Sequence, residues 1–478
     1  MRICLVLEGS YPYIYGGVSS WTDGLIKSMP QHEFVLLTLG PTKKKRGKFV
    51  YKLPDNVVEV QEHFFDEPLD LKPSRSYHFS FTKEERAEVI KMLECREPDW
   101  DILLEAFRRQ KHKPVSFLMS AEFIDMLSEI MDHTFTRAPY TSTFYMMRSM
   151  FLPVLYLMGI EPPKADLYHA ICTGYAGLMA VTAAHVEKKP ICLTEHGIYS
   201  REREEELIRT DWTTADFKEQ WINFYYMLSS AIYKKAACVS ALFRDASRIQ
   251  QELGTPKERC RVISNGIDYD RFGSVPPVEP GEIIEIGAAV RFAKIKDIKT
   301  MIYAFYQVHQ ELPNTRLHIL GPDEDPDYAV ECRELIKELD LSDSIITPGR
   351  VNDMPGYYGK LDFTILTSLS EGQPLTILEA FAAGRPCVTT DVGCCRDLIY
   401  GTPDDPYGQA GYIARPMEPL DIADKMVKLA KSRKDIRTFG ENGRKRVSAY
   451  YRKLGMTGKY ETMYKDALNF WKDRSKEH

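Results

Sequence analysis

The chain has 478 residues, of which 44% are hydrophobic and 27% are charged, and its formal net charge is −5. This length predicts roughly two to four domains, with enough apolar material for two sizeable cores. The slightly acidic balance gives no reason to expect a nucleic acid as partner. The 10 cysteines show neither a disulfide framework nor the paired spacing of a zinc site, so we expect a reducing cytoplasm.

No stretch of the sequence is typical of a signal peptide or a membrane span. The apolar run at residues 3–7 is too short for a signal peptide, and the run at 150–160 is too short to cross a bilayer. We therefore expect a cytoplasmic protein that can associate with a membrane through partners. The basic run KKKRGK at 43–48 could contact anionic lipid, but a solvated loop is the preferred interpretation.

The first half of the chain alternates between apolar strands and helices. Strands are expected at residues 2–9, 33–40, 165–171, 190–197, 237–241 and 260–268. The long interruption at about residues 64–163 is rich in Glu, Arg, Met and Phe with helical periodicity, which predicts a helical insertion. Alternation of this kind predicts a parallel sheet with helices on both faces.

A Pro- and Gly-rich stretch at 273–282 is the best candidate for a linker between two domains. Strands are expected after it at 282–290, 315–321, 344–349, 361–368 and 386–391, with helices from about residue 419. The pattern predicts two doubly wound α/β domains at 1–275 and 282–440, and C-terminal helices at 441–478 that pack back toward the first domain. Ligands of such sheets bind outside the carboxyl ends of the strands, so both domains should face one central cleft.

The first motif is EGSYPYIYGGVSSW at residues 8–21. Gly16 and Gly17 precede a predicted helix, for which Ser19 or Ser20 is a candidate N-cap. Glycines allow a close approach of the backbone to a ligand, and a helix N-terminus favours an anion. A plain Gly-Gly turn explains the same residues at least as well.

The second motif is TEHGIYSRERE at residues 194–204, directly after a predicted strand. His196 lies at the carboxyl end of that strand, where it either hydrogen-bonds a ligand or stabilises the loop. For an isolated histidine the structural role is the preferred one. The charge run that follows is typical of a solvated helix face, although its first turn could supply an arginine to the cleft.

The third motif is GAAVRFAKIKD at residues 287–297, after the first strand of the second domain. Arg291 offers a planar fork of donors and Lys296 a point charge, a combination suited to two phosphates. Lys294 is an alternative to Lys296. A basic surface loop is an equally good explanation when the motif is taken alone.

The fourth motif is LSEGQPLTILEAFAAGRP at residues 369–386. Gly372 and Pro374 predict a turn, and Thr376 stands three residues before Glu379, the spacing of a capping box. Glu371 is by itself an ordinary polar loop residue. Because the expected helix begins at 375–377, both glutamates could also reach one ligand at its N-terminus.

The order of these four motifs, along nearly the whole chain, resembles the family-4 retaining glycosyltransferases of the GT-B fold. In that family two Rossmann-like domains face a cleft, the first on the acceptor side and the second binding the nucleotide-sugar. The resemblance implies a hexosyltransferase that takes a UDP-sugar as donor and releases UDP. It also implies transfer with retention at the anomeric carbon, and no metal or other cofactor.

Three stretches and the helical insertion narrow the resemblance. YPYIYGGVSSW, TEHGIYSRERE and SEGQPLTILEA are similar to the cytoplasmic glycosyltransferases of Pel exopolysaccharide systems. Most of the wider family has an aromatic residue or Met where this chain has Gln373 and Pro374. The narrower resemblance implies transfer of a hexose or N-acetylhexosamine to a growing exopolysaccharide or other glycan acceptor, with an inner-membrane polysaccharide synthase complex as a candidate partner.

The resemblance also implies roles by position. Arg291 and Lys296 should hold the diphosphate and stabilise the departing UDP, and Glu379 should bind the ribose. Glu371 and His196 should contact the sugar, so the implied catalytic residues are Glu371, His196, Arg291 and Lys296. No side chain is assigned as a covalent nucleophile, because the family is described as reacting on one face of the sugar. Backbone groups near Arg350 and Val351 should contact the uracil, and the backbone of Gly17 should approach the phosphate. The implied donor-binding residues are Gly16, Gly17, Arg291, Lys296, Arg350, Val351, Glu371, Gly372, Gln373, Leu375, Thr376 and Glu379.

Two other functions compete with this one. A glycoside hydrolase could use Glu371 and Glu379 as its carboxyl pair, with a separation of roughly 5 to 9 Å across the scissile bond. Such an enzyme has no use for the nearby Arg291 and Lys296, which favour a nucleotide donor. A non-catalytic nucleotide-sugar-binding protein could share the fold, because fold does not fix function. A sugar phosphorylase and a nucleotide-sugar epimerase are minor alternatives.

Overall fold

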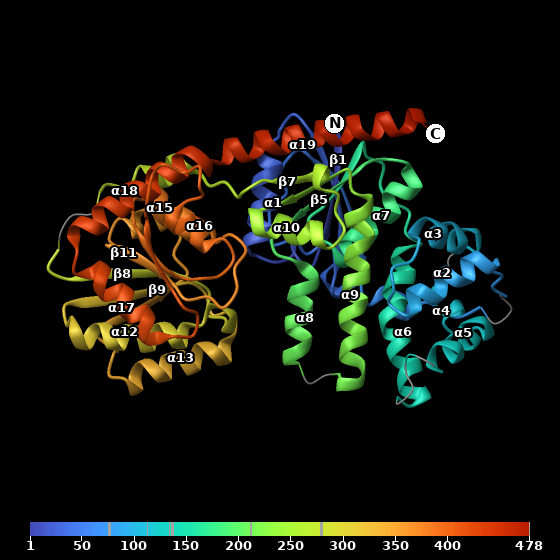
Figure 1. Ribbon diagram of the computed structural model, residues 1–478, viewed down its shortest axis with the longest axis horizontal. Coiled ribbons are helices and arrows are strands. Elements are labelled where there is room, and N and C mark those ends of the chain that lie inside the picture. Colours follow the sequence, from blue (N-terminus) through green and yellow to red (C-terminus); the bar gives the residue numbers. More distant parts are fainter. Residues whose placement is uncertain are drawn as a thin grey trace. The chain divides into compact units, whose positions relative to one another are not determined.

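Figure 1 shows the computed structural model, which describes residues 1–74, 78–111, 113–132, 134, 138–210, 213–277 and 281–477. The chain divides into two compact units. Unit 1 comprises Met1–Ile263 and Lys459–His478, and unit 2 comprises Ser264–Gly458. Residues 278–280 of the predicted linker lie outside the described residues.

In the described part of the chain, unit 1 is built on a seven-stranded parallel sheet in the order β3-β2-β1-β4-β5-β6-β7. Its strands are β1 (Arg2–Glu8), β2 (Glu33–Gly40), β3 (Val57–Phe64), β4 (Leu167–Ala170), β5 (Ile191–Glu195), β6 (Cys238–Ala241) and β7 (Cys260–Val262). Six of them lie in segments predicted as strands. The sequence did not predict β3, an edge strand that is mostly half-buried or exposed and so lacks a continuous apolar run.

The main helices of unit 1 beside this sheet are α1 (Gly17–Lys27), α7 (Gly174–Glu187), α8 (Tyr199–Arg209), α9 (Ala215–Lys235) and α10 (Arg244–Glu252). Helix α1 begins at Gly17, so the prediction that Ser19 or Ser20 caps it is wrong. Gly16 occupies the N-cap position, and no side chain caps this end. The backbone of the glycine pair therefore forms the helix N-terminus itself.

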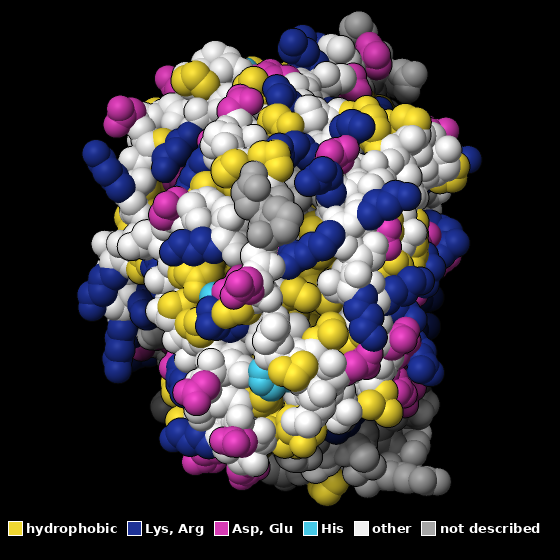
Figure 2. All heavy atoms as spheres, turned by 90° about the vertical axis from the view of Figure 1, so that its left-hand side faces the viewer, with side chains coloured by type: hydrophobic (Ala, Val, Ile, Leu, Met, Phe, Trp, Pro, Cys, Tyr) yellow, Lys and Arg dark blue, Asp and Glu magenta, His cyan; other side chains and the backbone are white. Residues whose placement is uncertain are grey.

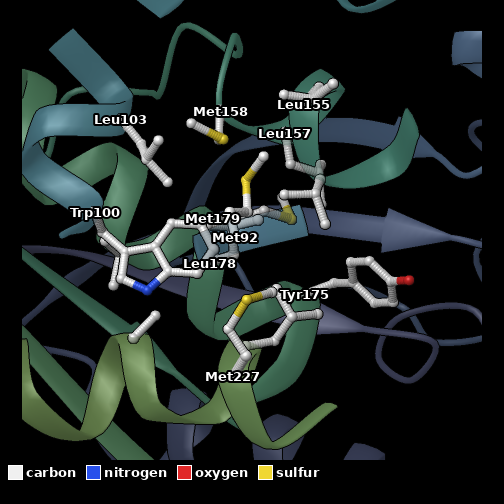
Figure 3. Close-up of a cluster of buried hydrophobic side chains, with 14 of the residues drawn as sticks. Met92, Trp100, Leu103, Leu155, Leu157, Met158, Tyr175, Leu178, Met179 and Met227 are labelled. Atoms are coloured by element: carbon white, nitrogen blue, oxygen red, sulfur yellow. The ribbon is translucent and has the colours of Figure 1, made fainter. Parts of the chain in front are cut away.

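The predicted helical insertion is present between β3 and β4. It contains η2 (Glu67–Asp70), α2 (Lys83–Leu93), α3 (Trp100–Arg109), α4 (Pro114–Phe117), α5 (Ala121–Met131) and α6 (Tyr140–Leu157). Its apolar side chains belong to the same core cluster as those of α7 and α9. Figure 3 shows part of this core, where Met92 and Trp100 of the insertion come together with Met179 and Met227. The insertion is therefore an integral part of unit 1.

In its described residues, unit 2 has a six-stranded parallel sheet in the order β10-β9-β8-β11-β12-β13. Its strands are β8 (Ile284–Ala289), β9 (Thr315–Leu320), β10 (Ile345–Gly349), β11 (Phe363–Leu366), β12 (Cys387–Thr390) and β13 (Gly411–Ala414). The first five were predicted, and the short β13 was not. The fold class predicted from the alternation, two doubly wound α/β sheets, is confirmed.

Helices cover both faces of the unit 2 sheet (Figure 1). The helices are η4 (Lys294–Lys296), α11 (Tyr269–Gly273), α12 (Ile298–Glu311), α13 (Pro326–Glu338), α14 (Met354–Tyr358), α15 (Leu375–Ala382), α16 (Cys395–Tyr400), α17 (Pro419–Ala430) and α18 (Arg433–Tyr450). Helix α12 packs against α13 and α17, and α15 packs against α11 and α18. On the face drawn in Figure 2, Lys and Arg side chains are interspersed with Asp and Glu, as the small net charge leads one to expect.

The division between the units falls after Ile263, where the sequence predicted residue 275. The residues that follow turn toward the end of the chain. The N–H of Ile267 donates to the carbonyl of Tyr451 at 2.9 Å, and the N–H of Lys453 donates to the carbonyl of Ile267 at 2.9 Å. These backbone bonds, with the packing of α11 on α15, attach residues 264–273 to unit 2.

The C-terminal helix α19 (Lys453–Glu477) begins in unit 2 and belongs to unit 1 from Lys459 onward. Tyr460 and Tyr464 are fully buried there. The hydroxyl of Tyr464 lies 2.9 Å from Nδ1 of His169, and the ring centroid of Tyr460 lies 5.4 Å from that of Trp21. The aromatic side chains of α19 thus complete the core of unit 1. No helix within the described ranges is both long enough and apolar enough for a bilayer crossing.

Candidate active site

The middle of the unit 2 sheet is where the strand order changes direction. Strand β8 lies between β9 and β11, so the loops that leave the carboxyl ends of β8 and β11 start side by side. Residues 290–297 follow β8 and residues 367–374 follow β11. The crevice at such a switch point is where doubly wound sheets bind their ligands. The third and fourth motifs therefore meet at the expected place.

Lys296 and Glu371 form an ion pair across this switch point. Nζ of Lys296 donates to Oε1 of Glu371 at 2.5 Å, and the hydroxyl of Ser368 donates to the same oxygen at 2.6 Å. The two side chains are 16% and 12% exposed. An ammonium group has three donors and a carboxylate accepts several bonds, so both can take a further partner. Lys294 is exposed; the choice of Lys296 over Lys294 as the phosphate contact stays a prediction.

The two loops are also joined through their backbones. The hydroxyl of Thr367 donates to the carbonyl of Lys296 at 3.0 Å, and the N–H of Leu369 donates to the carbonyl of Ile295 at 2.9 Å. These bonds fix the backbone on both sides of the ion pair. A charged pair held in this way needs little rearrangement when a ligand binds.

Arg291 lies in the same loop but has a different partner. Its guanidinium is paired with Glu324, which lies between β9 and α13, and the two side chains are 44% and 46% exposed. The structure therefore pairs the two predicted phosphate-binding cations with separate carboxylates. Because the Arg291–Glu324 pair is half exposed, water screens it and an incoming anion can compete with Glu324.

Helix α15 presents its N-terminus to this loop. The helix begins at Leu375 with Pro374 at the N-cap position, and no side chain caps it. The prediction that Thr376 and Glu379 form a capping box is therefore wrong: Pro374 starts the helix earlier, and Thr376 lies within its first turn. The first N–H groups of a helix have no partner inside the helix, so an uncapped end favours an anion or a hydroxyl oxygen.

Glu379 lies one turn further along α15. Burial raises the pKa of its carboxyl to about 7, against the opposing effects of Arg271 and of the hydroxyl of Tyr358. A raised pKa shows that the pocket around this carboxylate offers less stabilisation than water does. A ligand that donates hydroxyl groups to Glu379 would supply what the protein lacks.

Gln373 has a structural contact that the sequence did not reveal. Its Oε1 accepts a hydrogen bond from the N–H of Asn265 at 2.6 Å, and Nδ2 of Asn265 donates to the carbonyl of Gln373 at 3.3 Å. Both residues are buried. Gln373 therefore attaches the Glu371 loop to the first residues of unit 2.

The loop after β12 supports the same turn. The N–H of Cys394 donates to the carbonyl of Gly372 at 3.1 Å. Gly393 has a φ of +53°, and a Cβ there would lie 2.0 Å from the carbonyl oxygen of Glu371. Only glycine fits this position without displacing the Glu371 loop. Sequence reasoning missed Gly393 because its contact is with a residue distant in the chain.

Arg350 and Val351, the predicted uracil contacts, directly follow β10 at the same edge of the sheet. Arg350 is exposed and Val351 is half-buried, and they follow Gly349, whose φ is +75°. Their place at the carboxyl end of a strand fits the prediction. Their contact with a base stays a prediction.

In unit 1, the glycine pair of the first motif borders open space. A Cβ built on either Gly16 or Gly17 meets nothing within 4 Å. Gly16 is extended, with φ 174°, and Gly17 starts α1. Neither the backbone geometry nor the packing of unit 1 therefore requires glycine at these two positions. Space kept clear at an uncapped helix N-terminus is suited to a phosphate group.

His196 follows β5, as predicted, and packs its ring edge against Trp21 with 4.7 Å between centroids. Burial lowers the pKa of His196 to about 4, so the imidazole is neutral near pH 7. Among the described residues its Nε2 has no hydrogen-bond partner. A neutral ring with one unused nitrogen can exchange a hydrogen bond with a sugar hydroxyl.

Two buried carboxyls of unit 1 were not predicted. Burial raises the pKa of Glu8 and of Glu195 to about 7. Glu195 accepts from the hydroxyl of Tyr233 at 2.6 Å, and Glu8 accepts from that of Tyr199 at 3.2 Å. Both lie at carboxyl ends of strands, so their position follows from the strand assignment, but their burial does not.

These side chains lie at the switch point of unit 1, between β1 and β4. Oε2 of Glu8 accepts from the N–H of Ala176 in the first turn of α7, at 3.2 Å. The ring of Tyr199 packs on Gly174, where a Cβ would lie 2.4 Å from it. At this switch point of unit 1 the protein's own side chains thus contact one another.

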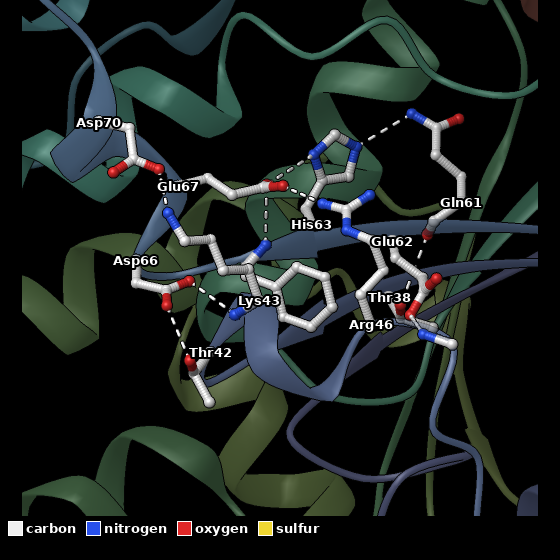
Figure 4. A network of polar contacts seen from close by, with 12 residues as sticks. Thr38, Thr42, Lys43, Arg46, Gln61, Glu62, His63, Asp66, Glu67 and Asp70 are labelled. Carbon is white, nitrogen blue, oxygen red and sulfur yellow. Dashed lines mark hydrogen bonds and ion pairs between the residues drawn. The ribbon is translucent and has the colours of Figure 1, made fainter.

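A polar network braces the loops beside this edge (Figure 4). In the basic run at 43–48, Lys43 pairs with Asp70 and Arg46 pairs with Glu67. Glu62 accepts hydrogen bonds from the hydroxyl of Tyr13 at 2.6 Å and from the N–H of Gly47 at 2.9 Å. Part of the basic run is therefore neutralised by carboxylates of η2, which disfavours a lipid contact for those two cations.

The described residues contain no group of three His, Cys, Asp or Glu side chains arranged to hold a metal ion. The expectation that no metal is needed stays a prediction.

Two doubly wound parallel sheets are the architecture of the GT-B fold, and comparison with known proteins supports that fold. The chain matches HepE of Anabaena, solved in complex with UDP, with a TM-score of 0.60 and 15% sequence identity over 97% of this chain and 100% of that one. At that identity the likeness shows the fold alone.

Residues 1–258 match the family described as Domain of unknown function (DUF3492), and because this match spans more than half of the chain, the chain belongs to that family. Residues 283–432 match the family described as Glycosyl transferases group 1. This second match contains both switch-point loops of unit 2. Together with the fold, it supports the class of glycosyltransferases.

Two curated relatives agree with this class. The N-acetyl-alpha-D-glucosaminyl L-malate synthase of Bacillus anthracis is 28% identical over 177 residues, which are 37% of this chain and 44% of that protein. The MMP alpha-(1->4)-mannosyltransferase of Mycolicibacterium hassiacum is 22% identical over 286 residues, 58% of this chain and 66% of that protein. The matches thus span about half the length of these relatives.

Proposed function

We propose that the chain is a retaining, metal-independent glycosyltransferase that moves a hexose or N-acetylhexosamine from a UDP-sugar to a glycan acceptor. The observation that carries the proposal is the Lys296–Glu371 ion pair, placed at the switch point of unit 2 beside the uncapped N-terminus of α15. A cation, a carboxylate and free helix amides side by side suit a ligand that is both a diphosphate and a sugar.

The proposed roles follow from chemistry. Lys296 and Arg291 bind the diphosphate and stabilise the negative charge that grows on UDP as it leaves. Glu371 accepts hydrogen bonds from the sugar hydroxyls, while the N–H groups of Leu375 and Thr376 donate to the ligand. Glu379 accepts hydrogen bonds from the ribose hydroxyls.

Unit 1 contributes three further proposed contacts. The backbone of Gly16 and Gly17 approaches a phosphate, and the neutral ring of His196 contacts the sugar. Arg350 and Val351 of unit 2 contact the uracil through their backbone groups. Gln373 is the exception among the predicted contacts, because its side chain is engaged by Asn265; we propose that it positions Glu371.

The proposed reaction exchanges one bond for another on the same face of the sugar. The bond from the anomeric carbon to the β-phosphate oxygen breaks, and a bond to the acceptor hydroxyl oxygen forms. The proton of that hydroxyl goes to the departing phosphate, so UDP is the second product. No residue of the chain needs to form a covalent intermediate.

We further propose a PelF-like role in the synthesis of a Pel-type exopolysaccharide, as a cytoplasmic enzyme that acts with an inner-membrane synthase complex. The support for it is the sequence of the motifs together with the helical insertion. Purified protein should release UDP from one of UDP-glucose, UDP-N-acetylglucosamine or UDP-N-acetylgalactosamine when glycan is present. Binding of all three without turnover would indicate a non-catalytic sugar-nucleotide protein instead.

One observation favours the alternative of a glycoside hydrolase. The pKa of about 7 for Glu379 is suited to a general acid. The Lys296–Glu371 bond opposes it, because a carboxylate held by a lysine is a poorer base or nucleophile. Hydrolysis of nitrophenyl glycosides without any nucleotide would establish the hydrolase, and its absence together with UDP release would establish the transferase.

A further inference from the structure

An exposed aromatic patch lies beside the glycine pair of unit 1. We call it the tyrosine platform and define it as Ile14, Tyr15, Val50 and Tyr51. Ile14, Tyr15 and Val50 are 51%, 54% and 40% exposed. Two of these residues come from the loop after β1 and two from the loop after β2, so the platform lies at the carboxyl edge of the unit 1 sheet.

The rings of the platform pack against a buried aromatic side chain. The ring of Tyr51 packs against that of Tyr15, with 5.1 Å between centroids and a tilt of 50°, and against that of the fully buried Tyr11, with 5.0 Å and a tilt of 55°. The hydroxyl of Tyr51 is 3.3 Å from that of Ser20, in the first turn of α1. The platform therefore lies against the helix that begins at Gly17.

The platform is also held in one arrangement. The hydroxyl of Tyr15 donates to the carbonyl of Val50 at 2.8 Å, and the N–H of Val50 donates to the carbonyl of Pro12 at 3.0 Å. Glu62, which Figure 4 labels, fixes the same two loops, because it accepts hydrogen bonds from the hydroxyl of Tyr13 and the N–H of Gly47. An exposed tyrosine that is tied at its hydroxyl gives up little conformational entropy when a ligand stacks on it.

We propose that the tyrosine platform is a binding subsite for the glycan acceptor, where a pyranose ring of the acceptor chain stacks on the exposed ring of Tyr15, which Tyr51 supports from one side. This inference rests on the proposed glycosyltransferase function. A pyranose presents a face of weakly positive C–H groups, which matches the negative face of an aromatic ring. Its hydroxyls remain at the rim, where water and polar backbone can bond them.

The position of the platform supports a glycan rather than a protein as its occupant. Tyr15 directly precedes Gly16 and Gly17, the proposed phosphate contact, so a sugar stacked on Tyr15 would lie near the reacting phosphate. The aliphatic side chains of Ile14 and Val50 widen the apolar surface next to the two rings. A growing chain could thus be held by residues behind its reacting end.

The test compares Tyr15→Ala with the wild type in UDP-release assays over a range of oligosaccharide concentrations. The probes are tetrasaccharides and monosaccharides of glucose, N-acetylglucosamine and N-acetylgalactosamine. Loss of one stacked ring should raise the KM for tetrasaccharide about tenfold. The increase in KM should be smaller for Tyr15→Phe, because phenylalanine keeps the ring. Affinity for the UDP-sugar, measured by calorimetry, should not change.

Tyr145→Ala is the matched control, since Tyr145 is a 62% exposed tyrosine on α6 of the insertion. Its KM for tetrasaccharide should equal that of the wild type. The same KM in Tyr15→Ala and wild type would overturn the proposal. Saturation-transfer NMR of each tetrasaccharide with the wild-type protein provides a second readout, and the absence of signal for all three would also overturn it. The affinity for the UDP-sugar, measured by calorimetry, tests the proposed function independently. Failure of the acceptor subsite can therefore be told apart from failure of the proposed function.

Discussion

The two sheets share a strand order around their switch points, but the side chains placed there differ in kind. In unit 1, Glu8 and Tyr199 contact each other, and the carboxyl is bonded to a helix amide. In unit 2, Lys296 and Glu371 stand 16% and 12% exposed beside an uncapped helix. The strand order determines where a ligand site can form. The side chains then decide which of the two switch points binds a ligand.

The largest expected effect is that of a substitution at the switch point of unit 2. Lys296→Ala should lower kcat/KM by about 10²- to 10³-fold, because it removes a donor from the departing diphosphate. Its melting temperature should also fall, since Glu371, only 12% exposed, loses its cationic partner. Lys294→Ala, two residues away and exposed, is the control and should keep wild-type kinetics. Wild-type turnover in Lys296→Ala would remove unit 2's crevice from the mechanism.

A second substitution tests whether the open space at the glycine pair serves a ligand. Gly17→Ala meets no neighbour and should stabilise the fold slightly, by about 0.4–1 kcal/mol. It should nevertheless lower kcat/KM by about 10- to 100-fold, because a methyl group displaces the phosphate. Gly455→Ala, also in a helix with open space around it, should change neither activity nor fold. Equal kinetics in the two variants would contradict the phosphate contact.

The buried carboxyls predict a pH dependence of stability in unit 1 and a pH dependence of UDP binding in unit 2. The pKa of Glu195 is raised from 4.5 to about 7, so the folded state keeps its proton where the unfolded state loses it. Stability should therefore fall as pH rises from about 4.5 to 7, by at most roughly 3 kcal/mol from this group. Urea unfolding of Glu195→Gln should show a flatter pH profile than the wild type. A profile as steep as the wild type's would show that Glu195 does not hold its proton.

The pKa of Glu379 is also raised to about 7, and we expect it to affect the pH dependence of UDP affinity. Ribose hydroxyls donate to the charged carboxylate, so affinity for UDP should rise as pH increases through 7. Calorimetry with the wild type and Glu379→Gln separates this effect from the titration of UDP itself, which both share. Parallel profiles for the two proteins would argue against a ribose contact.

The smallest expected effect is that of a chelator. Basic residues rather than a metal ion are proposed to hold the diphosphate, so UDP release should be the same with and without EDTA. Activity that EDTA abolishes and manganese or magnesium restores would require a metal site in unit 2.

Much of the fold could be predicted because the sheet strands are buried on both faces. Segments such as 33–40 are continuous apolar runs, and their alternation with helices fixes parallel topology. The same reasoning missed β3 and β13, which both lie at the edge of a sheet. Strand β3 is half exposed, and β13 has only Tyr412 and Ile413 as large apolar side chains. Propensity carries little information at sheet edges.

The site was predictable to the level of loops but not of contacts. The places of Lys296 and Glu371 follow from their position after β8 and β11, and the structure joins them. The bond between Gln373 and Asn265 links residues more than a hundred positions apart, and no local pattern contains it. The capping box failed for a local reason, because Pro374 at the N-cap starts α15 before Thr376.

Amide hydrogen exchange of the full chain, with and without saturating UDP, tests the central claim most directly. The account predicts slower exchange in unit 2 at residues 290–297 and 367–377, the two loops and the start of α15. It predicts no change in β1 of unit 1 (Arg2–Glu8), because the carboxyl of Glu8 is already bonded within the protein to Tyr199 and to the N–H of Ala176. Binding of UDP without any protection of the unit 2 loops would contradict the account.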